Sequence, residues 1–194
     1  MSFARLYAFV EQRRELPVSI EEVLVPEVIR LSAQDTIEFI PVDLDPEISL
    51  GHIKQFRQAK SVYDTDSEWV TSIRWHSGLN MCERRFVCCK ELMHVFDSAE
   101  ARTDTPVKFI TLLDELSAPP PSEQASPMYI SENRTKWMAL TILVPRPLRD
   151  WAVQQLNAGH SEYEVALALR IPEVLISTVV GERYDPILDS LLDL

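Results

Sequence analysis

Residues 84–97, with the sequence RRFVCCKELMHVFD, constrain the fold more than any other segment of the chain. At about 100° per residue in a helix, Lys90 lies about 40° to one side of His94 and Glu91 about 60° to the other. The opposite side is apolar and carries Cys89, Leu92 and Phe96. The spacing therefore predicts a helix whose apolar side packs on a core and whose polar face carries Lys90, Glu91 and His94.

The pentapeptide KELMH at residues 90–94 differs from the helix motif H-E-x-x-H only at its first position. In that motif two histidines one turn apart bind Zn²⁺, and the glutamate acts as general base. Glu91 and His94 are present here, but Lys90 stands where the first histidine ligand belongs. On its own, KELMH is also typical of a polar cluster on a helix surface, so its meaning depends on the rest of the chain.

Two strands are predicted before this helix. Residues 67–76 alternate between the two faces of a strand, and Ile37–Val42 favours a short strand with Pro41 at a sheet edge or strand end. Asn80, followed three residues later by Glu83, predicts an N-terminal capping box for the motif helix. Residues 52–59 are expected to form a further helix.

Helical spacing accounts for most of the remaining chain. Further helices are expected near residues 3–10, 20–31, 132–143, 147–158, 165–170 and 172–181. Residues 107–116 are expected to form a short helix or an apolar extended segment. The apolar and acidic tail, residues 187–194, is expected to close on the core, with a contact to a partner as the alternative. The sequence thus predicts an α+β fold in which a sheet of about three strands packs with several helices and the C-terminal segment is helical.

The order of these motifs resembles the ImmA/IrrE-type metallopeptidase family. In that family an R-R-F-x-x-A-H-E-x-x-H helix follows a strand, and a later helix of the form E-x-x-A-N-x-F-A-x-x-L-L-M-P supplies a third metal ligand. Arg84–Phe86 match the start of the first pattern, and residues 132–145 match the second in order and spacing. The resemblance covers about residues 65–180. It implies a zincin-like domain over residues 1–145 and a helical extension, residues 146–194, packed on it.

The resemblance also implies roles for individual residues. Glu91 takes the place of the general base, and His94 and Glu132 take those of metal ligands. Lys90 departs from the pattern at a ligand position, and Lys136 stands where a small amide is usual. Because an ammonium group is no ligand and is repelled by Zn²⁺, we expect Lys90 to pair with Glu91, Glu132 or both in the space of the metal.

Two hypotheses about function follow from the resemblance. In the first, the protein has no metal cofactor and is a non-catalytic regulatory or protein-interaction module from a bacterial or phage-derived system. Its partner would be a protein or peptide, for example a repressor of the Xre type. In the alternative, it is an active zinc endopeptidase that cleaves such a repressor, with His94 and Glu132 as ligands and His76 as a possible substitute ligand.

Composition disfavours several classes of partner and compartment. With 19 basic and 30 acidic residues, the chain has a net charge of −11, which opposes direct binding to nucleic acids or anionic membranes. No apolar run reaches the length of a membrane span, and no secretory signal is expected. The three cysteines, Cys82, Cys88 and Cys89, are too crowded for a disulfide framework and favour a reducing cytoplasm.

Overall fold

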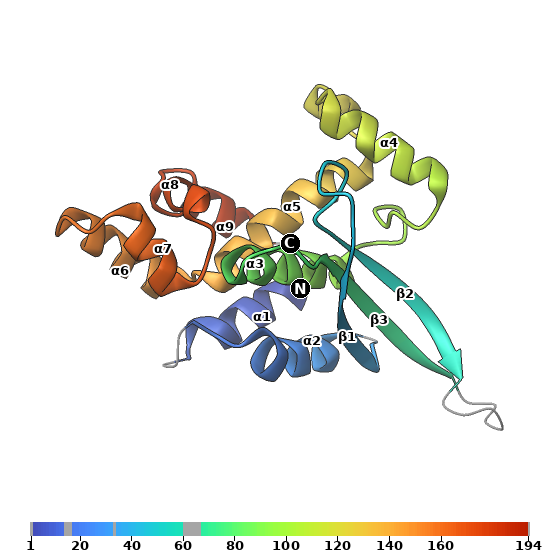
Figure 1. Ribbon diagram of the computed structural model, residues 1–194, viewed down its shortest axis with the longest axis horizontal. Coiled ribbons are helices and arrows are strands. Elements are labelled where there is room, and N and C mark those ends of the chain that lie inside the picture. The colour runs from blue at the N-terminus through green and yellow to red at the C-terminus, as the bar shows by residue number, and fades with distance from the viewer. Residues whose placement is uncertain (1, 14–16, 33, 60–66, 194) are drawn as a thin grey trace.

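The computed structural model describes residues 2–13, 17–32, 34–59 and 67–193, which form an α+β fold (Figure 1). Within these residues the sheet has three strands in the order β1-β3-β2. The central β3 is parallel to β1 and antiparallel to β2. The strands are β1 (Thr36–Val42), β2 (Gly51–Ala59) and β3 (Ser67–His76). The predicted fold class is therefore confirmed, including the short sheet and the helical C-terminal segment.

One element was predicted wrongly. Residues 52–59 form strand β2 and not a helix. Ile53 and Phe56 are spaced like one face of a helix, but each lies opposite a residue of β3 in an antiparallel ladder. The pairing of β2 with β3, which is distant in sequence, determines the conformation of residues 52–59. The local spacing of apolar residues does not indicate this pairing. Pro41 does lie in an edge strand, where its missing N–H leaves no hydrogen bond of the sheet unmade.

Helix α3 (Met81–Met93) follows β3 and carries the central motif. The Asn80 side chain accepts hydrogen bonds from the backbone N–H groups of Cys82 and Glu83, and the Glu83 carboxylate accepts one from the Asn80 N–H. The predicted capping box is thus confirmed. The α-helix is shorter than predicted, however, because His94–Phe96 form a separate 3₁₀ turn, η2.

Helix α5 (Pro127–Leu143) packs directly against α3. It begins five residues before the predicted start at Glu132, with the Ser126 side chain as its N-cap. Cys89 of α3 and Ala139 of α5 are fully buried at the contact, and the Cys89 thiol donates to the Ala139 carbonyl oxygen at 3.9 Å. The apolar side of the motif helix therefore faces the core, as predicted.

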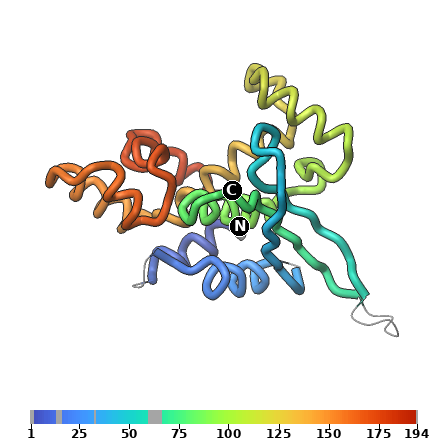
Figure 2. Tube along the Cα trace, in the orientation of Figure 1, coloured from blue at the N-terminus to red at the C-terminus, as the bar shows by residue number. Residues whose placement is uncertain are grey.

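The other described helices pack against this pair, the sheet or one another (Figures 1 and 2). They are α1 (Ser2–Glu11), α2 (Val25–Leu31), α4 (Pro106–Ser117), α6 (Arg146–Asn157), α7 (Glu162–Leu169), α8 (Ile176–Val180) and α9 (Tyr184–Leu192). Short turns of other helix types are η1 (Ile20–Leu24), η3 (Ser122–Gln124) and η4 (Glu173–Leu175). None of these described helices combines the length and apolar character needed to cross a membrane.

The two ends of the chain meet in one core. Helices α1 and α9 both pack against α5 and against each other. Leu188 and Leu191 of α9 are buried, so the tail closes on the core as expected. The Tyr184 hydroxyl donates to the Val144 carbonyl oxygen. A single buried cluster includes residues on both sides of Pro145, where the sequence places the domain boundary, and that boundary stays a prediction.

Gly51 marks a close approach between β2 and α3, and it supplies a test of this packing. A Cβ atom at Gly51 would lie 2.5 Å from Val87 Cγ1 and 3.3 Å from Glu91 Cγ. We expect Gly51→Ala to lower the free energy of unfolding by about 1–3 kcal/mol, because the buried Val87 must move. The measurement is chemical denaturation.

Gly78→Ala is the matched control. Its new Cβ would meet the ring end of His76, a side chain on the same turn that can rotate away. We expect a much smaller loss of stability for this variant. Equal stability of Gly51→Ala and the wild type would contradict the described packing of β2 on α3.

Candidate functional site

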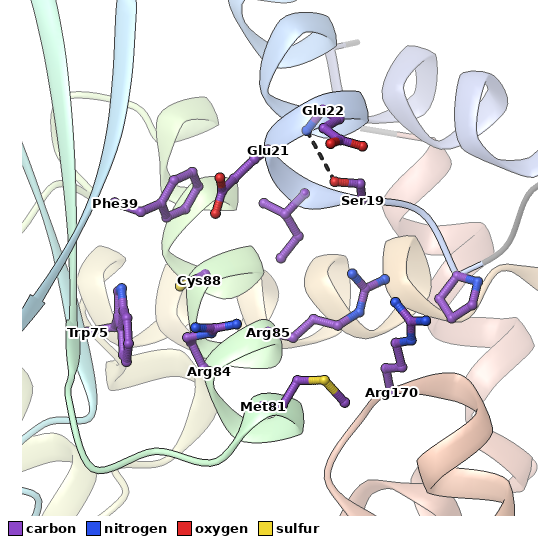
Figure 3. Close-up of a pocket in the computed structure, with 12 residues that line it drawn as sticks. Ser19, Glu21, Glu22, Phe39, Trp75, Met81, Arg84, Arg85, Cys88 and Arg170 are labelled. Atoms are coloured by element: carbon purple, nitrogen blue, oxygen red, sulfur yellow. Dashed lines mark hydrogen bonds between the residues drawn. The ribbon is translucent and has the colours of Figure 1, made fainter.

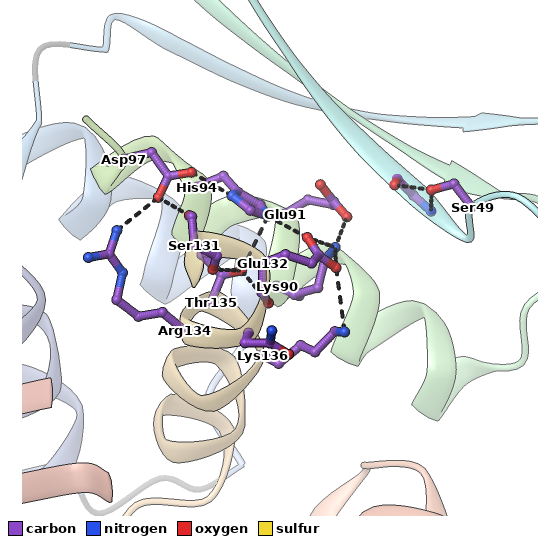
Figure 4. Close-up of polar contacts among 12 residues, drawn as sticks. Ser49, Lys90, Glu91, His94, Asp97, Ser131, Glu132, Arg134, Thr135 and Lys136 are labelled. Atoms are coloured by element: carbon purple, nitrogen blue, oxygen red, sulfur yellow. Dashed lines mark hydrogen bonds and ion pairs between the residues drawn. The ribbon is translucent and has the colours of Figure 1, made fainter. Parts of the chain in front are cut away.

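A buried group of charged side chains lies where α3 and η2 cross the first half of α5 (Figure 4). Thr135 lies one helical turn after both Ser131 and Glu132, so the three side chains share one face of α5. This face meets the polar face of the motif helix. We name the five titratable residues of the site the polar cluster: Lys90, Glu91, His94, Asp97 and Glu132.

Lys90 connects the two helices. Its Nζ lies 2.9 and 3.1 Å from the two carboxylate oxygens of Glu132, and 2.7 Å from Oε1 of Glu91. The contact with Glu91 is an ion pair rather than a hydrogen bond of regular geometry. Lys90 is 14% exposed, Glu91 3% and Glu132 13%. The pairing of Lys90 with both glutamates, expected from the sequence, is present.

The charges of the cluster stabilise one another. Burial alone lowers the pKa of Lys90, but the adjacent Glu91 and Glu132 carboxylates outweigh burial and raise it above its ordinary value. Burial alone raises the pKa of Glu132. The hydrogen bond from His94 and the charge of Lys90 outweigh that effect and hold the pKa of Glu132 well below its usual range. Both residues are therefore charged at neutral pH.

His94 lies between two carboxylates. Its Nδ1 is 2.7 Å from Asp97 Oδ2, and its Nε2 is 3.2 Å from Glu132 Oε2. Burial lowers the pKa of His94, but the hydrogen bonds to Asp97 and Glu132 outweigh burial and raise it to about 9. At neutral pH the ring is thus an imidazolium that donates from both nitrogens.

Sequence reasoning missed the residues that complete the site. Asp97 accepts from the Ser131 hydroxyl at 2.5 Å and lies 3.3 Å from Arg134 Nη2. Thr135 Oγ1 lies 3.2 Å from His94 Nε2 and donates to the Ser131 carbonyl oxygen at 3.0 Å. The spacing of Ser131 and Thr135 around Glu132 on one helix face is a local pattern that points to them. The position of Asp97, three residues after His94, is another.

Two other sequence candidates stay at the margin of the site or outside it. Lys136 is 44% exposed, and its Nζ lies 3.8 Å from Glu132. No hydrogen bond or ion pair within the described ranges connects His76 to Glu91, His94 or Glu132, so the structure does not bring this suggested ligand to the cluster. His52 of β2, which was misassigned to a helix, is electrostatically coupled to Glu91. Burial and the nearby Arg74 lower the pKa of His52, against the opposing effect of Glu91.

The donor atoms in this arrangement do not fit a zinc ion. Zinc is bound by thiolates, carboxylate oxygens and neutral imidazole nitrogens whose lone pairs are free. Here the Lys90 ammonium lies against both glutamates, and both ring nitrogens of His94 contact carboxylates. Within residues 2–13, 17–32, 34–59 and 67–193, no three His, Cys, Asp or Glu side chains are grouped to hold a metal ion.

Comparisons with family models, with curated proteins and with solved structures each find no match for this chain. The resemblance described above therefore rests on the order and spacing of its motifs.

The cluster predicts how stability depends on pH. The pKa of His94 is raised from 6.5 in the unfolded chain to about 9 when folded. Its stabilising contribution is complete below pH 6.5 and is lost as the pH rises through 9. We expect a loss of up to about 3 kcal/mol over this window, measured by chemical denaturation at several pH values.

The variant His94→Gln is the control for this effect. Because glutamine does not titrate, the variant should lack the component of the pH dependence between about pH 6.5 and 9 that the wild type shows. Parallel profiles for the two proteins would contradict a protonated His94. Glu132 acts in the opposite sense, since its depressed pKa makes its contribution disappear as the pH falls below 4.5.

Proposed function

We propose that this protein is a non-catalytic relative of the ImmA/IrrE-type metallopeptidases that acts as a regulatory or protein-interaction module. The observation that carries the proposal is the Lys90 ammonium group, which pairs with Glu91 and Glu132. These are the residues that the resemblance assigns to the general base and to a metal ligand. A side-chain cation thus takes the place that the family gives to the metal.

The state of the acid–base groups also supports a non-catalytic role. A general base needs a free lone pair directed at water or substrate. The Glu91 side chain is only 3% exposed, and its carboxylate lies 2.7 Å from the Lys90 ammonium group. His94 is an imidazolium held by two carboxylates, so it offers no lone pair to a metal.

An exposed apolar helix supports an interaction role. No residue of α4 is buried, and the helix projects from the rest of the fold (Figure 1). Val107 is 73% exposed and Ile110 58%, and Phe109 is also exposed beside them. Clustered apolar side chains of this kind are typical of protein contacts. We assign α4 to the binding of a protein partner, with an Xre-type repressor as the candidate that the resemblance suggests.

The proposed setting is the reducing cytoplasm of a bacterium or of a phage-infected cell. Cys82, Cys88 and Cys89 are all free thiols. Burial raises the pKa of both Cys88 and Cys89 to about 12, so these two are unreactive. Such thiols are compatible with a compartment in which disulfides are rare.

Metal analysis tests the non-catalytic assignment. We expect purified wild-type protein to contain far less than one zinc per chain, and Lys90→His to take up about one zinc, because His94 and Glu132 then share the site with a second imidazole. Lys90→Gln, which removes the charge without adding a ligand, is the matched control and should stay metal-free. Content is measured by plasma mass spectrometry, and binding by chelator-sensitive melting.

The outcomes of the metal experiment are distinct. Stoichiometric zinc in the wild type would overturn the non-catalytic proposal. A folded Lys90→His variant that takes up no zinc would instead overturn the assignment of Glu132 to the third ligand position.

The partner assignment is tested by mixing the protein with a purified Xre-type repressor from the same source. We expect the two to co-elute with the repressor intact, and Val107→Asp with Ile110→Asp to weaken the complex at least tenfold. Val174→Asp is the control, since Val174 is 79% exposed on η4 and not on α4. Cleavage of the repressor, or equal binding by the α4 variant, would contradict the proposal.

A further inference from the structure

A pocket lies beside the first half of α3 and shares no residue with the polar cluster (Figure 3). Its volume is about 430 Å³, which is within the range of pockets that hold small molecules. Its walls come from η1, from the sheet, from α3 and from the end of α7. Three arginines face it: Arg84 and Arg85 of α3, and Arg170 after α7.

The Arg85 guanidinium forms no ion pair with any described residue. It is half-buried, and its Nε and Nη2 have no hydrogen-bond partner among the described residues. Burial lowers the pKa of Arg85, and the charge of Arg170 adds to that effect. A half-buried guanidinium with two unpaired nitrogens is unfavourable, so an anion in the pocket would stabilise it.

The other charges around the pocket do not cancel these cations. Within the described part of the chain no ion pair joins Arg84, Arg85 or Arg170 to a carboxylate. Glu21 and Glu22 also line the pocket, but both are exposed to solvent. Among the described residues of the lining, three cations outnumber two anions, so this part of the wall is net positive inside a protein whose overall charge is −11.

Aromatic and apolar side chains form the rest of the wall. Phe39 and Trp75 extend from the sheet, and the Arg84 guanidinium lies 5.3 Å from the centre of a Trp75 ring. Ile20 and Met81 add further apolar surface. Such a wall suits the organic part of a ligand, whereas the guanidinium groups suit its phosphate oxygens, which they bind through paired N–H donors.

We propose that this pocket binds a small organic phosphate. Arg85 and Arg170 hold the phosphate, and the wall formed by Phe39 and Trp75 contacts the apolar or aromatic part of the ligand. The site shares no residue with the polar cluster or with α4, so its test is independent of the metal and partner experiments above.

Isothermal titration with ADP, pyrophosphate and adenosine at constant ionic strength tests the proposal. We expect ADP to bind, pyrophosphate to bind at least tenfold more weakly, and adenosine not to bind at millimolar concentration. Absence of ADP binding at millimolar concentration would overturn the proposal. Equal affinity for ADP and pyrophosphate would overturn the role of the aromatic wall.

Variants separate ligand binding from a structural role of the arginines. Arg85→Met should melt at a higher temperature than the wild type without ligand, because it removes an uncompensated buried charge, and should lose ADP binding at least tenfold. A structural Arg85 would instead give a lower melting temperature. Glu21→Gln should bind ADP more tightly, since it removes a negative charge from the rim.

Two further variants complete the experiment. Arg170→Asn should also lose affinity at least tenfold while it stays folded, because asparagine tolerates the left-handed backbone that Arg170 adopts, with φ of 56°. Arg57→Gln, in β2 and outside the pocket lining, is the control and should bind like the wild type. Unchanged ADP affinity in both Arg85→Met and Arg170→Asn would overturn the site.

Discussion

The ion pair between Lys90 and Glu132 is the interaction on which the arrangement of the site depends. It joins α3 to α5 at the end of an otherwise apolar contact, where Cys89 and Ala139 are fully buried. A buried ion pair adds little net stability over apolar packing, but loss of one partner leaves an uncompensated charge. Glu91 pairs with Lys90, and His94 lies between Glu132 and Asp97, so removal of one member leaves an uncompensated charge on its neighbours.

The charge balance of this set explains how a lysine can occupy a position that the resemblance assigns to a metal ligand. A zinc ion bound by neutral histidines would bring two positive charges to the glutamates. In this protein the Lys90 ammonium brings one positive charge, and the protonated ring of His94 brings the second. The raised pKa of His94 therefore contributes to this charge balance, because a neutral ring would leave the carboxylates under-compensated.

Helical spacing was sufficient to predict the parts of the site that lie within one element. It placed Lys90, Glu91 and His94 on one face, and the capping residue Asn80 fixed where their helix begins. It could not identify β2, whose pairing with β3 is a long-range interaction. Nor did it connect Asp97 to Ser131, since that hydrogen bond exists only once α5 has packed against α3.

Helix α3 carries cations at both of its ends, and the neighbouring elements give them different roles. Near its C-terminal end, α5 supplies Glu132 to Lys90, so the charge is satisfied within the protein. Near its N-terminal end no described residue supplies an acceptor to Nε or Nη2 of Arg85, and a pocket lies beside it. A basic side chain is thus neutralised within the protein where a carboxylate contacts it. It is available to a ligand where no described carboxylate does so. This difference in compensation is the physical basis on which we propose a structural role for the first group of charges and ligand binding for the second.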